Sequence, residues 1–587
     1  MRRDLARALG LAAAVACLWC YASGLTSRAA WRVPVEYEGD AWQTLGHLKA
    51  AADRNFRLVA PIEVPELGAP HGASWDGFLR QHKIQFLFVA ALARAIGLFQ
   101  AANLLPLAAA VLAALSFYGV SRYFRARPEW ALMGASAFAL SPFLFFRSLG
   151  HMTLTFYWPV PLAILAVTWA FGRHDLRVRS TRFAAAAAIA VIAGLHNIYY
   201  AALLAQFLAL AALARALGTR RLAAALAPIA LLLLLVGSVL VDNANVVLAA
   251  AHGRPTDSLA RPFGNLERYA LKPIELVVPI ANPGLAPWAP LSRVYVGGAL
   301  YRGEMGGAYL GIAGVAALVW LAASVTAGQL RRSRAAVPPA FLAVTFILSL
   351  SVVGGLNSLL GTLGFVFLRA TSRYSIWILA LALLWAVGRV SRSRFARRSG
   401  APAIALLAAV LALADQLPRR REPAESGRLA AHVASDAIFA RSLEAALPDG
   451  AMLFQLPVVP SPEGPRVLKA TDYEHLRPYL YTKHLRFSYG TDKGDARAAW
   501  QARADALDAE RLADALERIG FAGLIVNRKA YEDGAEELRK RLAASGRQEA
   551  WESPDHDFLF VRLRPAARSE APDAVILPAH EPERSAQ

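Results

Sequence analysis

Long apolar runs separated by short polar segments make up most of the first 415 residues. Runs such as Leu222–Val241 and Ala308–Ala327 approach the roughly 20 residues that cross a bilayer as a helix. The pattern predicts eleven membrane helices, at about 7–24, 103–121, 130–146, 157–172, 183–200, 201–217, 222–241, 308–327, 337–353, 374–388 and 401–415. The expected fold class of residues 1–415 is an α-helical polytopic membrane domain.

One more apolar stretch, Ile84–Leu98, is 15 residues long, carries Arg94, and decides the topology of everything after it. If it rests at the interface without crossing, the loops and ends on the side of the N-terminus hold 21 Lys and Arg residues against three acids. Because Arg and Lys near membrane helices resist translocation, this arrangement is strongly favoured over its inverse. We therefore expect an interfacial helix at 84–98 and a cytoplasmic N-terminus. The basic segments are 1–7, 122–129, 173–182, 215–221, 331–334 and 389–398.

This topology leaves three larger segments on the periplasmic side: a first loop at 27–82, a loop at 242–306, and everything after Asp415. Residues 416–565 are predicted to form a small periplasmic α/β domain. Residues 566–587, rich in Pro, Glu, Ala and Ser, are predicted to be a disordered tail. The expected elements of the domain are helices at 426–447, 495–520 and 534–545 and strands at 451–457, 521–526 and 557–563, the last with alternating polarity.

Composition excludes several classes of protein. Apolar residues make up 56% of the chain and charged residues 18%, with a mean hydropathy of +0.36, so a soluble cytosolic enzyme is ruled out. The basic loops account for nearly all of the net charge of +20, which is therefore a topology signal and no sign of a nucleic-acid partner. Both cysteines, Cys17 and Cys20, lie in the first apolar run, which excludes a disulfide framework.

Ionisable residues are almost absent near the centres of the predicted membrane helices, and polar residues gather at their outer ends. Charges inside a membrane usually mark ion pathways and proton relays, so their absence disfavours an ion-coupled transporter. We therefore expect an active or binding site at the outer lipid–water boundary.

The first outer loop carries three carboxylates at alternating positions, Glu36, Glu38 and Asp40, shortly before a helix-like run. Asp40 follows a glycine at the start of that run, so helix capping is one reading of this residue. The other reading is a general base, since partial desolvation at the membrane surface raises the pKa of a carboxylate that accepts a proton from a hydroxyl. The two readings are compatible.

Other outer turns carry Arg or His, and each of these residues alone is usually structural. Three of four such turns carry them, which is more than anchoring at the interface requires. His151 and His196 are candidates to hydrogen-bond a sugar or a phosphate, whereas a zinc site is disfavoured because no HExxH or paired Cys/His spacing occurs. Arg369 and Arg373 are predicted to lie on the outer side of the membrane, against the positive-inside trend. Either their side chains extend along apolar surface to reach the interface with their charged ends, or they bind the phosphate of a lipid.

The Gly39-Asp40 motif after the first span, the long first outer loop and the outer C-terminal domain together resemble the GT-C class of polytopic glycosyltransferases. These enzymes use polyprenyl-phosphate-linked sugars and include protein O-mannosyltransferases and lipid A aminoarabinose transferases. The stretch Asn103–Phe124, which leads through Arg125-Ala-Arg127 into Ala131–Ser141-Pro142, is similar to the stretch that joins their second and third spans. The phrase at 472–481 is similar to tails of uncharacterised membrane proteins of this kind. The likeness is architectural and covers residues 5–415.

The resemblance implies that Asp40 is the catalytic base. Members of the class often hold a second acidic residue in the second outer loop, and this chain has none between Arg147 and Tyr157. Some members of the class use a divalent metal and others do not, so no cofactor is predicted here.

We therefore expect a bacterial inner-membrane glycosyltransferase that moves a sugar from a polyprenyl-phosphate donor to a hydroxyl of a glycan, lipid or protein acceptor, with membrane lipids as its surroundings. Two alternatives stay open: a translocase or other transporter for lipid-linked sugars, and a non-catalytic scaffold in an envelope polysaccharide assembly. The candidate substrate-binding residues are Glu38, Arg147, His151, His196, Asn197, Tyr199, Glu267, Lys272, Glu304, Arg369 and Arg373.

Overall fold

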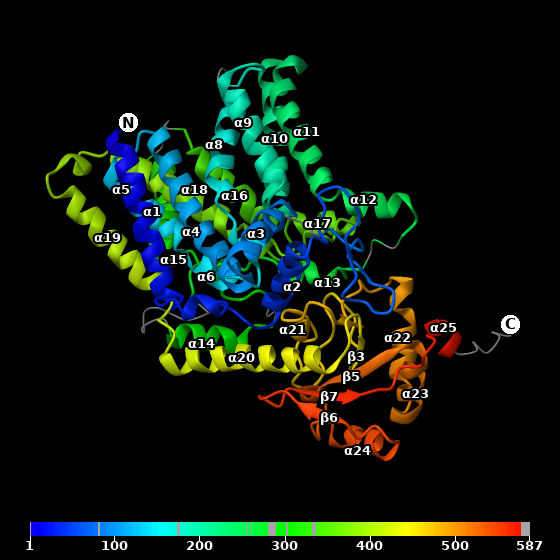
Figure 1. Cartoon of the computed structure of the whole chain (residues 1–587). Coiled ribbons are helices and arrows are strands. Elements are labelled where there is room, and N and C mark those ends of the chain that lie inside the picture. Colours follow the sequence, from blue (N-terminus) through cyan, green and yellow to red (C-terminus); the bar gives the residue numbers. More distant parts are fainter. Residues whose placement is uncertain are drawn as a thin grey trace. The chain divides into compact units, whose positions relative to one another are not determined.

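The computed structural model of the chain describes residues 2–79, 83–172, 176–254, 256, 258–259, 261–279, 289–300, 303–331 and 336–576. It divides into two compact units (Figure 1). Unit 1 comprises residues 1–35, 103–242 and 261–421, and unit 2 comprises 36–102, 243–260 and 422–587. The expected boundary at residue 415 therefore differs from this division, because the first outer loop groups with the C-terminal region. The basic segments 173–182 and 331–334 lie partly outside the described residues.

The regular elements of unit 1 in its described residues are all helices. Its longer helices are α1 (Arg2–Ala22), α4 (Leu98–Tyr123, which begins in unit 2), α5 (Pro128–Ala139), α8 (Pro159–Phe171), α9 (Thr181–Gly194), α10 (Ile198–Thr219), α11 (Leu226–Asp242), α14 (Ala289–Gly298), α15 (Gly311–Leu330), α16 (Pro339–Ser351), α18 (Ser375–Ser391) and α19 (Ala401–Gln416). Short helices join them: η1 (Ala30–Arg32), α6 (Pro142–Arg147), α7 (Met152–Thr155), η2 (Leu222–Ala225), α13 (Gly264–Arg268), η3 (Pro273–Leu276), α17 (Leu356–Thr362), η5 (Thr371–Tyr374) and η6 (Phe395–Arg397).

Seven helical segments of the described chain are long and apolar enough to cross a membrane, so the protein is a multi-pass membrane protein. They are 2–22, 98–123, 128–147, 198–219, 222–242, 311–330 and 371–391. Four shorter apolar helices, α8, α9, α16 and α19, occupy the remaining predicted positions. At about 1.5 Å per residue these four are shorter than the roughly 30 Å hydrocarbon core, so the count of eleven crossings stays a prediction.

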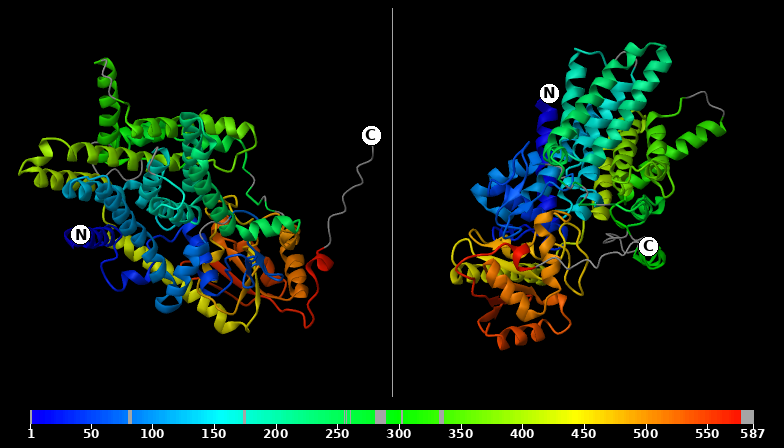
Figure 2. Two further views of the ribbon diagram at one scale, coloured as in Figure 1. Left: turned by 90° about the horizontal axis from the view of Figure 1, so that it is seen from above. Right: turned by 90° about the vertical axis from the view of Figure 1, so that its right-hand side faces the viewer.

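The turn between α9 and α10 corrects one predicted boundary. One helix is predicted from the sequence to end at residue 200, whereas α9 ends at Gly194 and α10 begins at Ile198. The cause is Asn197, whose side chain accepts a hydrogen bond from the backbone N–H of Tyr199 and so caps α10. Tyr199 therefore belongs to the first turn of α10. In Figure 2, α9, α10 and α11 run side by side.

The helices of unit 1 form a bundle, and its two ends can be told apart by the segments that meet there. At one end, the backbone N–H of Arg127, before α5, donates to the hydroxyl of Ser391, at the end of α18. Nearby, Arg122 at the end of α4 pairs with Asp4 of α1 at 3.2 Å. The basic segments 1–7, 122–129 and 389–398 therefore meet at this end, and the α5–α6 and η5–α18 segments lead away from it to the opposite end.

The sheet of unit 2 has five strands in the order β4 (Arg486–Phe487), β3 (Met452–Leu456), β5 (Phe521–Asn527), β7 (Phe558–Arg562) and β6 (Ala550–Glu552). Strand β3 pairs in parallel with β4 and β5, while β7 runs antiparallel to β5 and β6. A separate pair, β1 (Glu63–Val64) and β2 (Ala73–Ser74), is antiparallel. The helices of the unit are α2 (Asp40–Ala52), α3 (Lys83–Ile96), α12 (Ala244–Ala251), α20 (Pro423–Ala446), α21 (Leu476–Tyr479), η7 (Ala496–Ala498), α22 (Ala499–Asp505), α23 (Ala509–Ile519), η8 (Arg528–Ala530), α24 (Glu536–Ala544) and α25 (Pro572–Val575).

Helices cover both faces of the five-stranded sheet. On one face, Phe439 of α20 stacks on Phe558 of β7 with ring centroids 5.9 Å apart. On the other, Leu559 of β7 joins the apolar core formed with α22 and α23. The alternation expected along 557–563 is therefore absent: four successive residues of β7 are buried because neither face meets solvent. The helix expected over 495–520 is broken into η7, α22 and α23.

The interfacial helix expected at 84–98 corresponds to α3, which packs against α2 within unit 2. Its 14 residues span about 21 Å, too short for a straight crossing of a bilayer. Its position relative to a membrane stays a prediction.

The first part of the C-terminal tail is ordered, contrary to the sequence prediction. Arg518 of α23 pairs with Glu570 at 2.8 Å, and the backbone N–H of Ala566 donates to the carbonyl of Glu517. Ile576, at the end of α25, is buried in the core of the unit. The composition resembles that of a disordered segment, but these few contacts fix residues 566–576; residues 577–587 lie outside the described part of the chain.

Candidate functional site

Two arginines and one glutamate of unit 1 form a buried charge cluster at the end of the bundle opposite the basic segments. Arg147 donates from Nη2 to Oε2 of Glu304 at 2.6 Å. Arg373 donates from Nε to both carboxylate oxygens at 3.1 Å and from Nη2 to Oε1. The exposed fractions of the Arg147, Glu304 and Arg373 side chains are 0%, 11% and 16%. We call these three residues the arginine–glutamate cluster.

Local structure places each arginine at a helix end. Pro142 starts α6 at a position that needs no backbone donor, and α6 ends after Arg147, where Ser148 takes a positive φ of 38°. The Arg147 guanidinium lies 5.0 Å from the centre of the Phe146 ring, which shields it from solvent. Arg373 lies in η5, directly before α18. The cluster therefore forms where α6 ends and α18 begins.

Tyr199, the second residue of α10, brings a third helix end to the cluster. Its ring lies under the Arg373 guanidinium, 4.6 Å from centroid to Cζ, and its hydroxyl accepts from the backbone N–H of Ala370 at 3.3 Å. Arg369 lies over a different ring, that of Tyr269, at 4.8 Å. Of the two arginines predicted before the tenth span, the described contacts thus bring Arg373 to Glu304 and place Arg369 beside Tyr269.

The charges of the cluster control the protonation of its neighbours. Burial by itself raises the pKa of Glu304, but Arg147 and Arg373 outweigh burial and hold this pKa well below its usual range. Burial and the positive charge of Arg147 lower the pKa of His151 to about 3. With so low a pKa, His151 is neutral at physiological pH, although its Nε2 lies 4.0 Å from Glu304 Oε1. Glu304 is thus an anion held by two cations.

The third outer turn has a packing role in the contacts that the structure describes. His196 accepts a hydrogen bond from Trp158 Nε1 at 3.1 Å, and its Nδ1 lies 2.9 Å from the Ile192 carbonyl. Burial lowers its pKa to about 4, so the imidazole is neutral. Asn197 caps α10 and donates from Nδ2 to the Thr153 carbonyl. Substrate-binding roles of His196 and Asn197 stay predictions.

Two further candidates lie on the chain between unit 1 helices α11 and α15. Lys272 donates from Nζ to the Arg268 carbonyl at 2.7 Å, and burial lowers its pKa. Glu267 lies in α13 and is partly exposed. The contacts of the described chain do not bring either side chain to the arginine–glutamate cluster.

The acidic residue predicted as the base, Asp40, lies in unit 2. It is the first residue of α2, with Gly39 at the N-cap position with φ +49°, whereas Glu38 is exposed in the preceding turn. A second carboxylate, that of Asp472, is close enough to Asp40 for the two charges to interact. Burial and then the Asp40 charge raise the pKa of Asp472 to about 7, although the Gly464 backbone N–H stabilises its anion.

Asp472 is a second acidic residue near Asp40, and it was not among the residues singled out from the sequence. It follows Thr471, whose hydroxyl donates to the buried carboxylate of Glu474 at 2.9 Å, and it precedes Tyr473, which has a positive φ of 66°. Glu474 also pairs with Lys529 at 2.7 Å. The turn carrying Asp472 is therefore held firmly. The sequence signal was the acidic phrase at 472–474, which carries no sign of its distance from Asp40.

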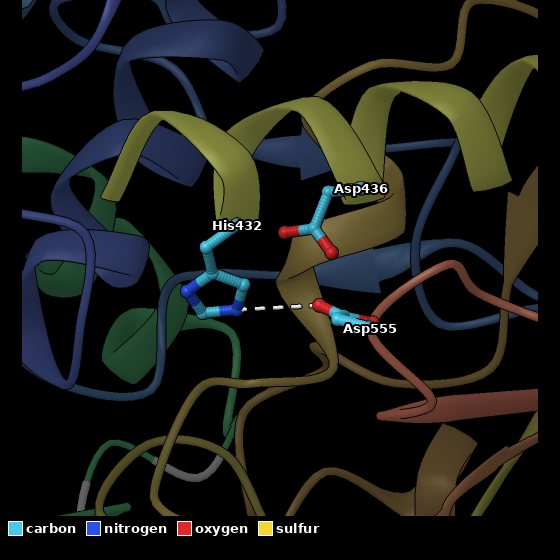
Figure 3. A group of neighbouring side chains, drawn as sticks. All are labelled: His432, Asp436 and Asp555. Atoms are coloured by element: carbon cyan, nitrogen blue, oxygen red, sulfur yellow. Dashed lines mark ion pairs between the residues drawn. The ribbon is translucent and has the colours of Figure 1, made fainter. Parts of the chain in front are cut away.

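One group of side chains in unit 2 has the composition of a metal site. Figure 3 shows His432, Asp436 and Asp555 converging, with possible ligand atoms all within 4.8 Å of one another. However, the fully buried Arg477 donates to both oxygens of Asp436, at 2.7 and 2.9 Å, and to Asp555 at 3.0 Å. The hydroxyl of Tyr37 donates to Asp436 as well, at 2.6 Å. The arginine already supplies the positive charge, so this group is an ion-pair network between α20, α21 and the β6–β7 turn.

Comparison with known proteins gives a family match and a set of similar structures. The family model described as a domain of unknown function, DUF6311, matches residues 86–416. No curated protein matches the chain.

The chain is similar to three solved membrane proteins. The mycobacterial arabinofuranosyltransferase AftD is 16% identical with a TM-score of 0.48, over 90% of this chain and 37% of that one. ArnT from Cupriavidus metallidurans bound to undecaprenyl phosphate is 14% identical with a TM-score of 0.43, over 94% and 97%. The Archaeoglobus fulgidus oligosaccharyltransferase AglB, with an inhibitory peptide and a dolichol-phosphate, is 13% identical with a TM-score of 0.43, over 94% and 74%. The chain thus spans little more than a third of the length of AftD.

Proposed function

The chain belongs to the DUF6311 family, and we propose that it is a glycosyltransferase of the bacterial inner membrane. It takes a sugar from a polyprenyl-phosphate donor and passes it to an acceptor hydroxyl on the periplasmic side. The observation that carries this proposal is the arginine–glutamate cluster, in which two largely buried guanidinium groups, those of Arg147 and Arg373, hold one anion at the ends of apolar helices.

The chemistry of the cluster favours a phosphate ester as its ligand. Arginine presents planar pairs of N–H donors that match phosphate oxygens, and it keeps its charge in buried surroundings. A lipid-linked phosphate is the anion that reaches helix ends in a membrane protein. The proposal therefore assigns Arg147 and Arg373 to the donor phosphate.

The reaction follows from this assignment. The acceptor oxygen attacks the anomeric carbon of the sugar, and the bond from that carbon to the phosphate oxygen breaks with its electron pair going to the phosphate. Asp40 takes the proton of the acceptor hydroxyl, and polyprenyl phosphate leaves with an additional negative charge. Arg147 and Arg373 stabilise that charge as it develops, which is the main source of rate enhancement in such a site.

The test uses the purified full-length protein in proteoliposomes with a panel of polyprenyl-phosphate sugars, and it measures both glycosyl transfer and donor binding. Asp40→Asn is expected to lower transfer by about 10²–10⁴-fold with donor binding retained, since only the base is lost. Arg373→Gln is expected to weaken donor binding. Asp449→Asn, an exposed turn residue of unit 2, serves as the matched control.

Two outcomes would contradict the proposal. An unchanged transfer rate in Asp40→Asn removes this residue from the mechanism. Movement of the lipid-linked sugar across the bilayer without transfer, in the wild-type protein, replaces the enzyme with a translocase.

A further inference from the structure

The segment that carries Glu304 is fitted closely against the chain around it. A Cβ atom added at Gly303 would lie 2.4 Å from the Arg268 carbonyl oxygen. One added at Gly307 would lie 2.8 Å from the Phe146 ring and 3.0 Å from Nη2 of Arg147. Gly306 between them has a φ of +93°, which favours glycine. These glycines allow the segment to approach the cluster closely and seat the Glu304 carboxylate on the two arginines.

The Glu304 carboxylate satisfies Arg147 only in part. Arg147 is fully buried, yet only its Nη2 donates to Glu304, and Nε and Nη1 have no hydrogen-bond partner among the described residues. A guanidinium has five N–H donors, and a carboxylate has only two oxygens to share between two arginines. A tetrahedral phosphate ester presents its oxygens in more directions. The cluster therefore has donors left over for an anion of another shape.

We propose that Glu304 occupies the phosphate position of the cluster in the ligand-free protein and that a phosphate ester binds by displacing it from Arg147 and Arg373. The inference rests on the proposed function only in taking the ester to be lipid-linked. A carboxylate and the phosphodiester of a polyprenyl-phosphate sugar each carry one negative charge, so this exchange leaves the charge of the cluster unchanged. The polyprenyl monophosphate used as the probe brings part of a second negative charge. Without Glu304, two buried guanidinium groups would face each other with no counter-ion, which is strongly unfavourable.

Because the Glu304 carboxylate competes with the phosphate ester for the two arginines, it lowers the apparent affinity of the protein for that ester. The observed dissociation constant equals the intrinsic one divided by the fraction of molecules in which Glu304 has left the arginines. Glu304 is therefore a gating residue that makes no bond to substrate. Removing its charge frees the arginines and strengthens phosphate binding, which is the opposite of the effect expected for a substrate ligand.

The experiment measures binding of polyprenyl phosphate to the full-length protein in nanodiscs, with wild type, Glu304→Gln and Glu304→Asp. Binding at least tenfold tighter in Glu304→Gln, and an intermediate gain in Glu304→Asp, support the inference. Glu129→Gln is the matched control, because Glu129 also pairs with an arginine, Arg127, at 2.6 Å and is expected to leave binding unchanged. Unchanged or weaker binding in folded Glu304→Gln overturns the inference.

Two further arms separate the sources of the phosphate. Inorganic phosphate and neutral polyprenol are tested as competitors. Inorganic phosphate that competes as strongly as polyprenyl phosphate itself supports the displacement of Glu304 but contradicts a lipid-linked ligand, whereas competition by polyprenol alone overturns the displacement. Failure of wild type and of every variant to bind any phosphate contradicts both proposals. An affinity for polyprenyl phosphate that is the same in wild type and in the Glu304 variants contradicts only this inference.

Hydrogen exchange of the wild-type protein provides a measurement that needs no variant to fold. Addition of polyprenyl phosphate is expected to speed backbone exchange in residues 303–310, because Glu304 is released from its two partners. Slower or unchanged exchange there in the ligand-bound protein overturns the inference.

Discussion

The carboxyl of Asp472 allows a sharp test of the acidic pair in unit 2. Burial and the neighbouring Asp40 raise its pKa from 3.8 to about 7. The substitution Asp472→Asn keeps the size of the side chain and its ability to accept a hydrogen bond, but it removes the ionisation. The variant therefore isolates the free-energy cost of a charged Asp472.

The magnitude follows from the two pKa values. A rise from 3.8 to about 7 corresponds to about 4 kcal/mol, because each pKa unit is worth about 1.4 kcal/mol. Asp472 is only partly shielded from solvent, which reduces the expected effect to about 1–3 kcal/mol. The folded protein holds the proton more tightly than the unfolded chain. The free energy of unfolding therefore falls as pH rises from about 4 to about 7, and the loss is complete above that window.

The assay is thermal unfolding of the detergent-solubilised protein between pH 4 and pH 8.5. Wild type and Asp472→Asn are expected to differ least near pH 4, where the carboxyl is protonated in the folded protein and only partly ionised in the unfolded chain, while the variant is more stable by about 1–3 kcal/mol at pH 8. The single substitution Asp40→Asn in the wild-type protein removes the neighbouring charge, so the pKa of Asp472 is raised less. The free energy of unfolding then falls over a narrower range of pH. Asp449→Asn, on an exposed turn, is the control for the loss of one surface carboxylate.

A difference between wild type and Asp472→Asn that is the same at every pH would refute this reasoning. So would equal curves for Asp472→Asn and Asp449→Asn. Either result means that the carboxyl is well hydrated in the folded protein and that Asp40 does not influence its protonation.

Two other predictions concern the ion-pair network and the topology. Arg477→Met leaves Asp436, Asp555 and Asp557 without their shared cation and is expected to cost about 3–5 kcal/mol in thermal unfolding, whereas His432→Ala, at the partly exposed edge, costs far less; equal losses would contradict the charge network. A periplasm-dependent reporter fused after Gln587 is expected to be active and a cytoplasm-dependent one inactive, and the reverse pattern would invert the orientation of the whole chain.

The sequence determined where the helices of unit 1 lie. Each of the eleven predicted apolar segments overlaps an apolar helix, because about 20 consecutive apolar residues have few alternatives to a helix in a membrane. Strands β3 and β5 and helix α20 were likewise visible as local patterns. Such features depend on neighbours along the chain, which a sequence displays directly.

Tertiary structure alone decided which polar residues meet. Arg147 contacts a glutamate 157 positions later, and that glutamate lies 69 positions before Arg373. Nothing in the pattern around Glu304 distinguishes it from Glu267, which stays away from the cluster in the contacts described. Similarly, Asp472 interacts with Asp40 across more than 400 residues of chain. Pairings of this kind depend on how helices pack and on how far each side chain reaches, and these are properties of three-dimensional contact that no local spacing encodes.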